Sequence, residues 1–297
     1  MMWKQVISVA SAGEAVALLA EHGPAARVMA GGTDLLIEIE RGVRSGIETI
    51  IDISRAADLN NISLDGGYIR LGALVTHNDA VASELIRSRA LPLAQASWEV
   101  GAPQIRNRAT IAGNVITASP ANDTISPLLA LDAEVELQSV RGVRRVPLNQ
   151  FYSGLRRTVM EPDELLTAIF VRAMQPNERG AFIKLGLRRA QAITVVNVSA
   201  VLAFDGDMVS RAMITLGSVA PTVIRVPDAE AVLLGKPLTP EVIAEAARVA
   251  AATPKPITDV RSTAEYRTEM IAVLITRALR QIASGTVASL PQAPAML

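Results

Sequence analysis

The stretch AGGTDLL, residues 30–36, follows a short apolar segment and precedes a run with helical spacing, and Asp34 is its only acid–base group. Gly31 and Gly32 can adopt positive φ, which turns successive backbone N–H groups toward one concave side where they bind anionic oxygen. The alternative is a tight strand-to-helix turn that Thr33 or Asp34 caps. The rest of the chain has to decide between an anion-binding loop and a turn.

Strand and helix patterns alternate around this stretch, and they predict an α/β unit over residues 1–57. A hairpin with its turn at residues 65–67 opens a second unit, which we place at residues 58–175. The polar, turn-rich stretch 174–180 predicts a boundary, and a third unit follows at residues 178–290. The chain is thus expected to contain three units.

The third unit has the pattern of an antiparallel sheet followed by helices. We expect three strands, at residues 181–189, 194–204 and 210–220. We expect three helices after them, at residues 227–235, 240–253 and 263–284. Together with the first two units, this pattern predicts an α+β fold.

The composition excludes several classes of function. Lysine plus arginine equals aspartate plus glutamate, 29 against 29, so no field of one sign is present to hold a nucleic acid. The chain has no cysteine, so disulfides and iron–sulfur ligation would have to belong to a partner. The first residues lack a signal-peptide pattern and no apolar run reaches about 18 residues, so we expect a cytoplasmic protein without a membrane span.

The two histidines, His22 and His77, show no metal-ligand spacing, so we expect no metal site. His22 is typical of a helix C-terminus, where a cation interacts well with the helix dipole. For His77 we expect a surface position or a hydrogen-bonded one. No carboxylate pair, nucleophile elbow or Ser-His-Asp set is present, so we predict no catalytic residue and expect a cofactor to supply any reactivity.

A second glycine-bearing loop lies in the passage 101–122, where Gly, Pro, Asn, Ser and Thr occur with little periodicity. Loops of this length inside a compact domain are usually functional. Its centre, RATIAGNVITASPAND at residues 108–123, combines the Thr110 hydroxyl, the Asn114 amide and Gly113, where a ligand can approach the backbone closely. The alternative is a pair of turns made rigid by the two prolines of the passage.

Two such loops suit a ligand with two phosphates, or with a phosphate and a polar ring system. Neither loop has the glycine spacing of a Rossmann motif, and neither ends in the Gly-Lys-Ser/Thr of a phosphate-binding P-loop. Phosphoryl transfer is therefore disfavoured.

AGGTDLL and IRNRATIAGNVITASPANDTISPLLALDAEVEL (residues 105–137) resemble the FAD-binding medium subunit of the molybdenum hydroxylases, the xanthine dehydrogenase and aerobic carbon monoxide dehydrogenase family. The resemblance covers essentially the whole chain, because KLGLRRAQAITVVNVSAVLAF (184–204), ITLGSVAPTVIR (214–225) and STAEYRTEMIAVLITRAL (262–279) are similar to the family's C-terminal domain. One departure is Ala112, where the family usually has glycine.

The resemblance implies a two-subdomain FAD-binding fold of the vanillyl-alcohol-oxidase or PCMH type, followed by a C-terminal domain with a three-stranded antiparallel sheet and a helix bundle. It implies that the backbone of residues 30–34 holds the FAD pyrophosphate. The residues it assigns to FAD are Ala30, Gly31, Gly32, Thr33, Asp34, Leu35, Val100, Gly101, Ile105, Ala109, Thr110, Gly113, Asn114, Ile116, Thr117, Asp123 and Lys184.

Two of these assignments have a structural alternative. Asp123 would hydrogen-bond a polar group of the cofactor, but an aspartate before a helical run can instead be the helix N-cap. Lys184 would lie near the flavin ring, where a cation favours the anionic reduced flavin. The alternative for Lys184 is an exposed lysine on a strand.

The resemblance also implies partners. A large molybdopterin subunit would oxidise the substrate, and a small subunit with two [2Fe–2S] clusters would pass electrons to FAD on this chain, in a dimer of heterotrimers. The acceptor would be NAD, oxygen or a quinone. Two alternatives are a stand-alone FAD-dependent oxidoreductase of the same fold and a flavin-free scaffold subunit. Neither the substrate nor the acceptor follows from the sequence.

Overall fold

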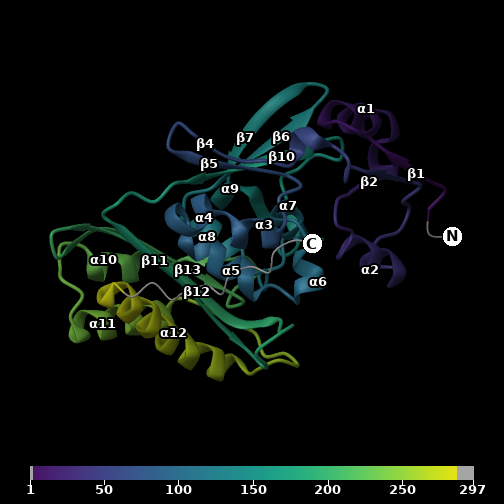
Figure 1. Cartoon of the computed structure of the whole chain (residues 1–297). Coiled ribbons are helices and arrows are strands. Elements are labelled where there is room, and N and C mark those ends of the chain that lie inside the picture. The colour runs from purple at the N-terminus through teal and green to yellow at the C-terminus, as the bar shows by residue number, and fades with distance from the viewer. Residues whose placement is uncertain (1–2, 286–297) are drawn as a thin grey trace.

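The computed structural model describes residues 3–285 (Figure 1), and its three larger sheets fall one in each of the three predicted units, whose names we keep for description. In the first unit, three strands form a parallel sheet in the order β1-β3-β2. Its elements are β1 (Gln5–Ser8), α1 (Ala12–His22), β2 (Ala26–Met29), α2 (Leu35–Glu40) and β3 (Thr49–Asp52). Helix α1 is amphipathic and has Ser11 as its N-cap, and it ends at His22, which confirms the helix C-terminus predicted there.

The second unit is built on a five-stranded antiparallel sheet in the order β4-β5-β10-β6-β7. Its strands are β4 (Ile62–Asp65), β5 (Tyr68–Gly72), β6 (Glu134–Ser139), β7 (Gly142–Pro147) and β10 (Leu165–Arg172), with β8 (Tyr152–Gly154) and β9 (Arg157–Thr158) as a separate pair. The predicted hairpin at residues 65–67 is confirmed as the β4–β5 turn. Strand β10 is buried over Leu165–Val171 and closes the sheet from far along the chain.

The helices of the second unit cluster below this sheet (Figure 1). They are α3 (His77–Ala82), α4 (Glu84–Arg89), α5 (Leu91–Glu99), α6 (Pro103–Arg106), α7 (Ile111–Thr117), α8 (Ile125–Ala130) and α9 (Leu148–Phe151). The passage 101–122, predicted as a loop, therefore contains two helices, α6 and α7. Each spans at most two turns, which is too short for a helical period to stand out in the sequence.

The third unit follows Gln175 in the chain and contains an antiparallel sheet in the order β11-β12-β13-β14. Its strands are β11 (Glu178–Gly186), β12 (Thr194–Asp205), β13 (Met208–Gly217) and β14 (Ile224–Arg225), and its helices are α10 (Pro227–Leu233), α11 (Pro240–Ala252) and α12 (Ala264–Ser284). The prediction of three strands is incomplete, because the two-residue β14 adds a fourth. The predicted helices are confirmed; residues 286–290 of the expected unit lie outside the described residues.

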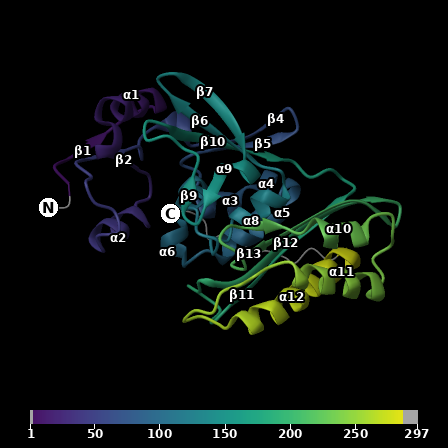
Figure 2. The same ribbon diagram turned by 180° about the vertical axis from the view of Figure 1, so that it is seen from behind.

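The second and third units stack as alternating layers of sheet and helix, as both views show (Figures 1 and 2). Helices α5 and α8 lie between the two sheets and contact strands of the third unit. Helices α10 and α12 contact the other face of that sheet, and α11 packs against both of these helices. Strand β12 is consequently buried on both faces over its first ten residues.

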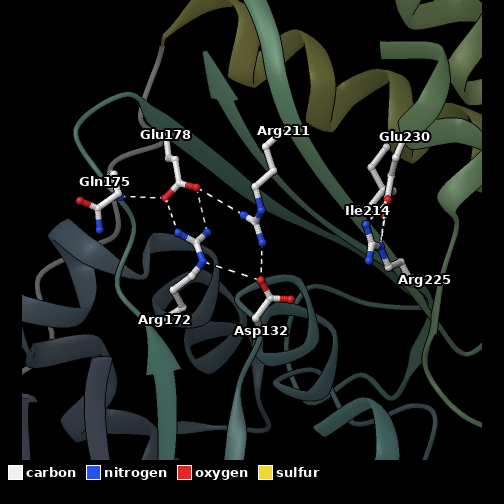
Figure 3. Close-up of polar contacts among 8 residues, drawn as sticks. All are labelled: Asp132, Arg172, Gln175, Glu178, Arg211, Ile214, Arg225 and Glu230. Atoms are coloured by element: carbon white, nitrogen blue, oxygen red, sulfur yellow. Dashed lines mark hydrogen bonds and ion pairs between the residues drawn. The ribbon is translucent and has the colours of Figure 1, made fainter. Parts of the chain in front are cut away.

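Ion pairs fasten the second unit to the third (Figure 3). Glu178 of β11 accepts two hydrogen bonds of 2.8 Å from Arg172, the last residue of β10. Arg211 of β13 reaches the same carboxylate at 3.3 Å and also pairs with Asp132 before β6. These ion pairs therefore connect the sheet of the second unit to the sheet of the third unit.

Within residues 3–285, no helix is both long and apolar enough to cross a membrane.

Candidate functional site

A cavity of about 600 Å³ lies between the first unit and the second. Both glycine-bearing stretches line it, although more than 70 residues separate them. The predicted site residues that line it are Ala30, Gly31, Gly32, Thr33, Asp34, Leu35, Val100, Ile105, Ala109, Thr110, Gly113, Asn114, Ile116 and Thr117. A volume of this size is typical of a small-molecule or cofactor site.

The first stretch forms the predicted strand, glycine turn and helix, but its two glycines serve different purposes. Gly32 has φ +71°, a left-handed conformation that favours glycine and that a β-branched residue adopts only with strain. Gly31 does not have positive φ, so that expectation was wrong. A Cβ on Gly31 would instead lie 1.8 Å from the Arg108 carbonyl oxygen, so the glycine permits the two loops to touch.

The alternative interpretation, a strand-to-helix turn capped by a side chain, requires a capping hydrogen bond that Asp34 does not make. Asp34 occupies the N-cap position of α2 but makes no side-chain capping hydrogen bond. Its carboxylate accepts a hydrogen bond of 3.2 Å from the hydroxyl of Thr117, which lies in α7 of the second unit. The Asp34 side chain therefore links the two units and does not close a local turn.

The second stretch places a short helix against the cavity. Thr110 caps α7 by accepting a hydrogen bond of 3.0 Å from the Gly113 amide. The Asn114 side chain accepts a hydrogen bond from the Thr124 hydroxyl at 2.6 Å, which fixes the end of the passage. Gly113, Asn114 and Thr117 follow on this helix and line the cavity.

Arginines that the sequence analysis missed lie at the same cavity. Arg44 and Arg156 both pair with the carboxylate of Glu38, and the Arg156 contact is 3.4 Å long. Arg27, one residue into β2, also lines the cavity and donates to the carbonyl of Pro24 at 2.9 Å. Arg27 and Arg44 flank AGGTDLL in the sequence, which is the signal that could have found them.

His77, expected at the surface or hydrogen-bonded, is neither. It is the first residue of α3, is fully buried, and lines the cavity. Among the described residues, no group forms a hydrogen bond to either ring nitrogen. Burial, followed by the charge of Arg106, lowers the pKa of His77 to about 3, so the imidazole is neutral.

Asp123 and Lys184 lie outside this cavity's lining and pair with each other, with 2.6 Å between Lys184 Nζ and Asp123 Oδ2. Lys184 is 5% exposed in its side chain, so the exposed-lysine alternative is wrong. Thr124 occupies the N-cap position of α8, so the capping alternative for Asp123 is also wrong. Asp123 also accepts hydrogen bonds from Thr194 and, at 3.5 Å, from Asn197, and burial raises its pKa against these partners.

Gly101 lines a second cavity of about 490 Å³ beside the first. Glu99 lines it too, and the backbone carbonyl of Glu99 accepts a hydrogen bond of 3.0 Å from Lys184. Burial raises the pKa of the Glu99 carboxyl. Of the three predicted residues outside the first cavity, Gly101 lines the second cavity, whereas Lys184 and Asp123 do not line it and are connected to it through the Glu99 carbonyl.

The chemistry of the first cavity is that of binding. Its walls combine backbone groups, hydroxyls, the amides of Asn114 and Asn122, three arginines and four carboxylates, so the backbone N–H groups of the glycine-bearing stretches are the better candidates to bind an anion. Among residues 3–285 there is no group of three or more His, Cys, Asp or Glu that could hold a metal ion. A redox or transfer reaction at this cavity therefore needs a bound cofactor.

Comparison with known protein families agrees with this geometry. The model of the FAD binding domain in molybdopterin dehydrogenase matches residues 3–172, which include both loops. The model of the CO dehydrogenase flavoprotein C-terminal domain matches residues 181–282. The chain belongs to the FAD-binding medium subunits of the molybdenum hydroxylases. The family resemblance stated from the sequence is thereby confirmed, as is FAD as the cofactor.

Relatives of this medium subunit align over nearly their whole length. The carbon monoxide dehydrogenase medium chain of Hydrogenophaga pseudoflava is 35% identical over 269 residues, covering 91% of this chain and 93% of the relative. The putative xanthine dehydrogenase FAD-binding subunit of Escherichia coli is 30% identical over 275 residues, covering 92% and 93%. These relatives are subunits of oxidoreductases, and this medium subunit is one as well.

Solved structures confirm the α+β fold of the medium subunit. The carbon monoxide dehydrogenase of Hydrogenophaga pseudoflava that lacks the Mo-pyranopterin moiety of its cofactor superposes with a TM-score of 0.91 at 33% identity, covering 96% of this chain and 99% of that chain. Quinoline 2-oxidoreductase from Pseudomonas putida 86 superposes with a TM-score of 0.89 at 25% identity, covering 95% and 97%.

Proposed function

We propose that FAD lies in the cavity between the first two units, with its pyrophosphate at the backbone of residues 30–34. The observation that supports this position is the convergence of both glycine-bearing stretches on one cavity lined by arginines. The tight contact at Gly31 and the positive φ of Gly32 fix the loop in the shape that presents backbone groups to an anion. Thr110, Gly113, Asn114 and Thr117 then line the flavin and ribityl portion.

We extend this proposal to the second cavity. Val100 lines the first cavity and the next residue, Gly101, lines the second, so the two cavities meet at one short segment of the chain. Asp123 and Lys184 stand beside the second cavity through the Lys184 contact to the Glu99 carbonyl. We propose that Lys184 favours the reduced flavin when FAD is bound, although the Asp123 carboxylate at 2.6 Å offsets part of its charge.

The chain then acts as the electron-transferring subunit of an oxidoreductase. We propose that it accepts electrons from [2Fe–2S] clusters on a small subunit and passes them to NAD, oxygen or a quinone. A large molybdopterin subunit completes the complex, as a dimer of heterotrimers in the cytoplasm. The absence of cysteine from the sequence supports this division, because the clusters must be held by another chain.

Replacing Gly32 by valine tests the position of FAD. A β-branched residue at φ +71° costs about 1–3 kcal/mol of strain, so the loop changes shape or the affinity falls. We expect FAD affinity, measured by flavin fluorescence quenching, to fall by roughly tenfold to a hundredfold with the circular dichroism spectrum retained. Gly67→Val is the matched control, since Gly67 also has positive φ but lies in the β4–β5 turn.

Normal FAD content in Gly32→Val would show that AGGTDLL is only a turn. The electron-transfer role has its own test, in which the chain is purified alone and together with its proposed partners. Iron should be found only in the complex, and substrate should reduce the flavin only there. Substrate turnover by the isolated chain would favour the stand-alone oxidoreductase, and a chain that refuses FAD would favour the scaffold.

A further inference from the structure

Arg106 is a buried cation that holds the end of helix α5. The residue lies in α6 and is 6% exposed, and its guanidinium donates hydrogen bonds to three neutral oxygens. Two are the backbone carbonyls of Trp98, at 3.0 Å, and Val100, at 3.2 Å, and the third is the Asn78 amide oxygen at 3.2 Å. The guanidinium also lies over the indole of Trp98, 4.6 Å from the ring centre. One side chain therefore fixes both the backbone and the ring at this helix end.

The carbonyls at the end of α5 need partners from outside the helix. The last carbonyls of a helix have no intrahelical N–H donor and carry a partial negative charge, which cations stabilise. The Glu99 carbonyl accepts a hydrogen bond of 3.0 Å from Lys184. The Gly101 carbonyl accepts one of 3.2 Å from the backbone amide of Gln191. All four carbonyls of residues 98–101 are therefore engaged, three of them by cationic side chains.

The segment 98–101 lies where the two cavities meet. Val100 lines the first cavity, and the other three residues of the segment line the second. The Val100 amide donates to the Ser97 carbonyl at 3.3 Å and the Val100 carbonyl accepts from Arg106, so the contact that Val100 offers a ligand is mainly apolar. A shift of this segment would move a wall of both cavities together.

We propose that Arg106 is a positioning residue for FAD, which acts on the cofactor by fixing the cavity wall at Val100. The inference rests on the proposed position of FAD in the first cavity. It goes beyond that proposal because Arg106 is not among the residues assigned to FAD from the sequence. A guanidinium suits this task, since its planar fork donates several hydrogen bonds in fixed directions, whereas an ammonium is a point charge on a flexible stem. Contacts within the chain thus shape the wall that FAD binds.

Replacing Arg106 by lysine tests the positioning role. Lysine keeps the charge but does not hold the Trp98 and Val100 carbonyls in the fixed geometry of a guanidinium, so the segment loosens. FAD affinity, measured by flavin fluorescence quenching at a temperature where variant and wild type are folded, should fall by roughly three- to tenfold. The visible circular dichroism of the bound flavin should change as well, because it reports the surroundings of the ring.

Arg267→Lys is the matched control. Arg267 is fully buried in α12 and also donates to two backbone carbonyls, those of Val195 at 2.7 Å and Ser218 at 2.9 Å, but it lines neither cavity. Arg267→Lys should lower the melting temperature and leave FAD affinity and the flavin spectrum unchanged. The comparison separates a loss of stability from the loss of a positioned wall.

The fluorescence of Trp98 gives a second readout that does not require FAD. The chain has two tryptophans, so Trp3→Phe leaves Trp98 as the only one. In that background, the fluorescence anisotropy of Trp98 should fall when Arg106 is replaced by lysine, because the indole loses the cation that holds it. It should stay high in Arg267→Lys.

An Arg106→Lys chain with wild-type FAD affinity and an unchanged flavin spectrum would overturn the inference. An unchanged Trp98 anisotropy would do the same, because the segment would then not depend on the arginine. If Gly32→Val loses FAD in that case, the proposed position of the cofactor stands without Arg106. If Gly32→Val also keeps FAD, the cofactor lies elsewhere and both proposals fail.

Discussion

Two interfaces within this chain are completed by different means. Between the first and second units lies the cavity of about 600 Å³, and Thr117–Asp34 and Arg156–Glu38 contacts cross it at 3.2 Å and 3.4 Å. Between the second and third units, buried carboxylates already have their partners. Glu178 alone accepts hydrogen bonds from two arginines and a backbone amide (Figure 3).

The two interfaces therefore differ in role: one encloses a ligand cavity, and the other holds two parts of the chain together. At the junction of the second and third units, the chain satisfies its own charges, so this interface is formed without any ligand. At the cavity, few direct contacts cross between the units, and the two glycine-bearing stretches line an open volume of about 600 Å³. We infer that FAD completes the first interface, whereas the second serves as the rigid support for it.

Breaking the Lys184–Asp123 pair should have the largest effect on the junction. Lys184→Met leaves a buried carboxylate that is 8% exposed without its cation, which costs about 3–5 kcal/mol in the free energy of unfolding. Urea denaturation of the FAD-free chain measures this loss. Arg248→Met is the control, since its pair with Glu245 lies at the surface with 69% of the arginine side chain exposed.

The double variant Lys184→Met with Asp123→Asn should recover much of the lost stability, because no unpaired charge is left in the interior. A Lys184→Met chain as stable as the wild type would mean that the junction does not depend on its charges. In that case the contrast between the two interfaces would fail.

Glu178→Gln should give an intermediate and pH-dependent effect. Burial acts to raise the pKa of Glu178, but Arg172, the Gln175 amide and Arg211 outweigh it and hold the pKa below its ordinary value. The carboxylate therefore stabilises the fold fully above its unfolded pKa of about 4.3, and this stabilisation is lost as the pH falls through the lower folded pKa.

At neutral pH we expect Glu178→Gln to lower the free energy of unfolding by about 1–3 kcal/mol, since the half-buried Arg172 and Arg211 lose a charged partner. The difference from the wild type should narrow as the solution is acidified, which urea titrations at several pH values would detect. Glu245→Gln at the surface is the matched control. If the difference in free energy of unfolding between the variant and the wild type did not change with pH, the loss of stability would come from packing and not from the charge of Glu178.

The sequence predicts the local elements of the site better than its long-range contacts. AGGTDLL contains its own strand exit, glycine turn and helix start, so its secondary structure follows from local patterns. The reason for Gly31 could not follow, because the Arg108 carbonyl that excludes a side chain comes from a different loop. Helices α6 and α7 were likewise hidden, as their few residues lack a readable period.

The burial of individual side chains and their partners in the fold could not be predicted from the sequence either. The sequence gives separate interpretations for two residues: Asp123 as a helix cap or cofactor ligand, and Lys184 as a surface lysine or cofactor ligand. In the fold these residues, 61 positions apart in the sequence, form one buried ion pair. His77 follows Thr76 in a normal helix-start pattern, and nothing in that pattern indicates that its ring is fully buried. Tertiary packing determines which side chains are buried and which form pairs, and this packing cannot be read from local patterns in a single sequence.

Arg156→Ala should have the smallest effect and tests the cavity side of the comparison. Its side chain is 56% exposed and its partner Glu38 keeps Arg44, so we expect the free energy of unfolding to change by less than about 1 kcal/mol. Because Arg156 lines the cavity, its charge attracts the FAD phosphates, and that attraction is screened by salt. Stopped-flow association of FAD should therefore slow at low ionic strength and match the wild type at high ionic strength, while the adjacent Arg157→Ala changes less. A loss of FAD as large as that of Gly32→Val would mean that side-chain charge, and not the loop backbone, holds the cofactor.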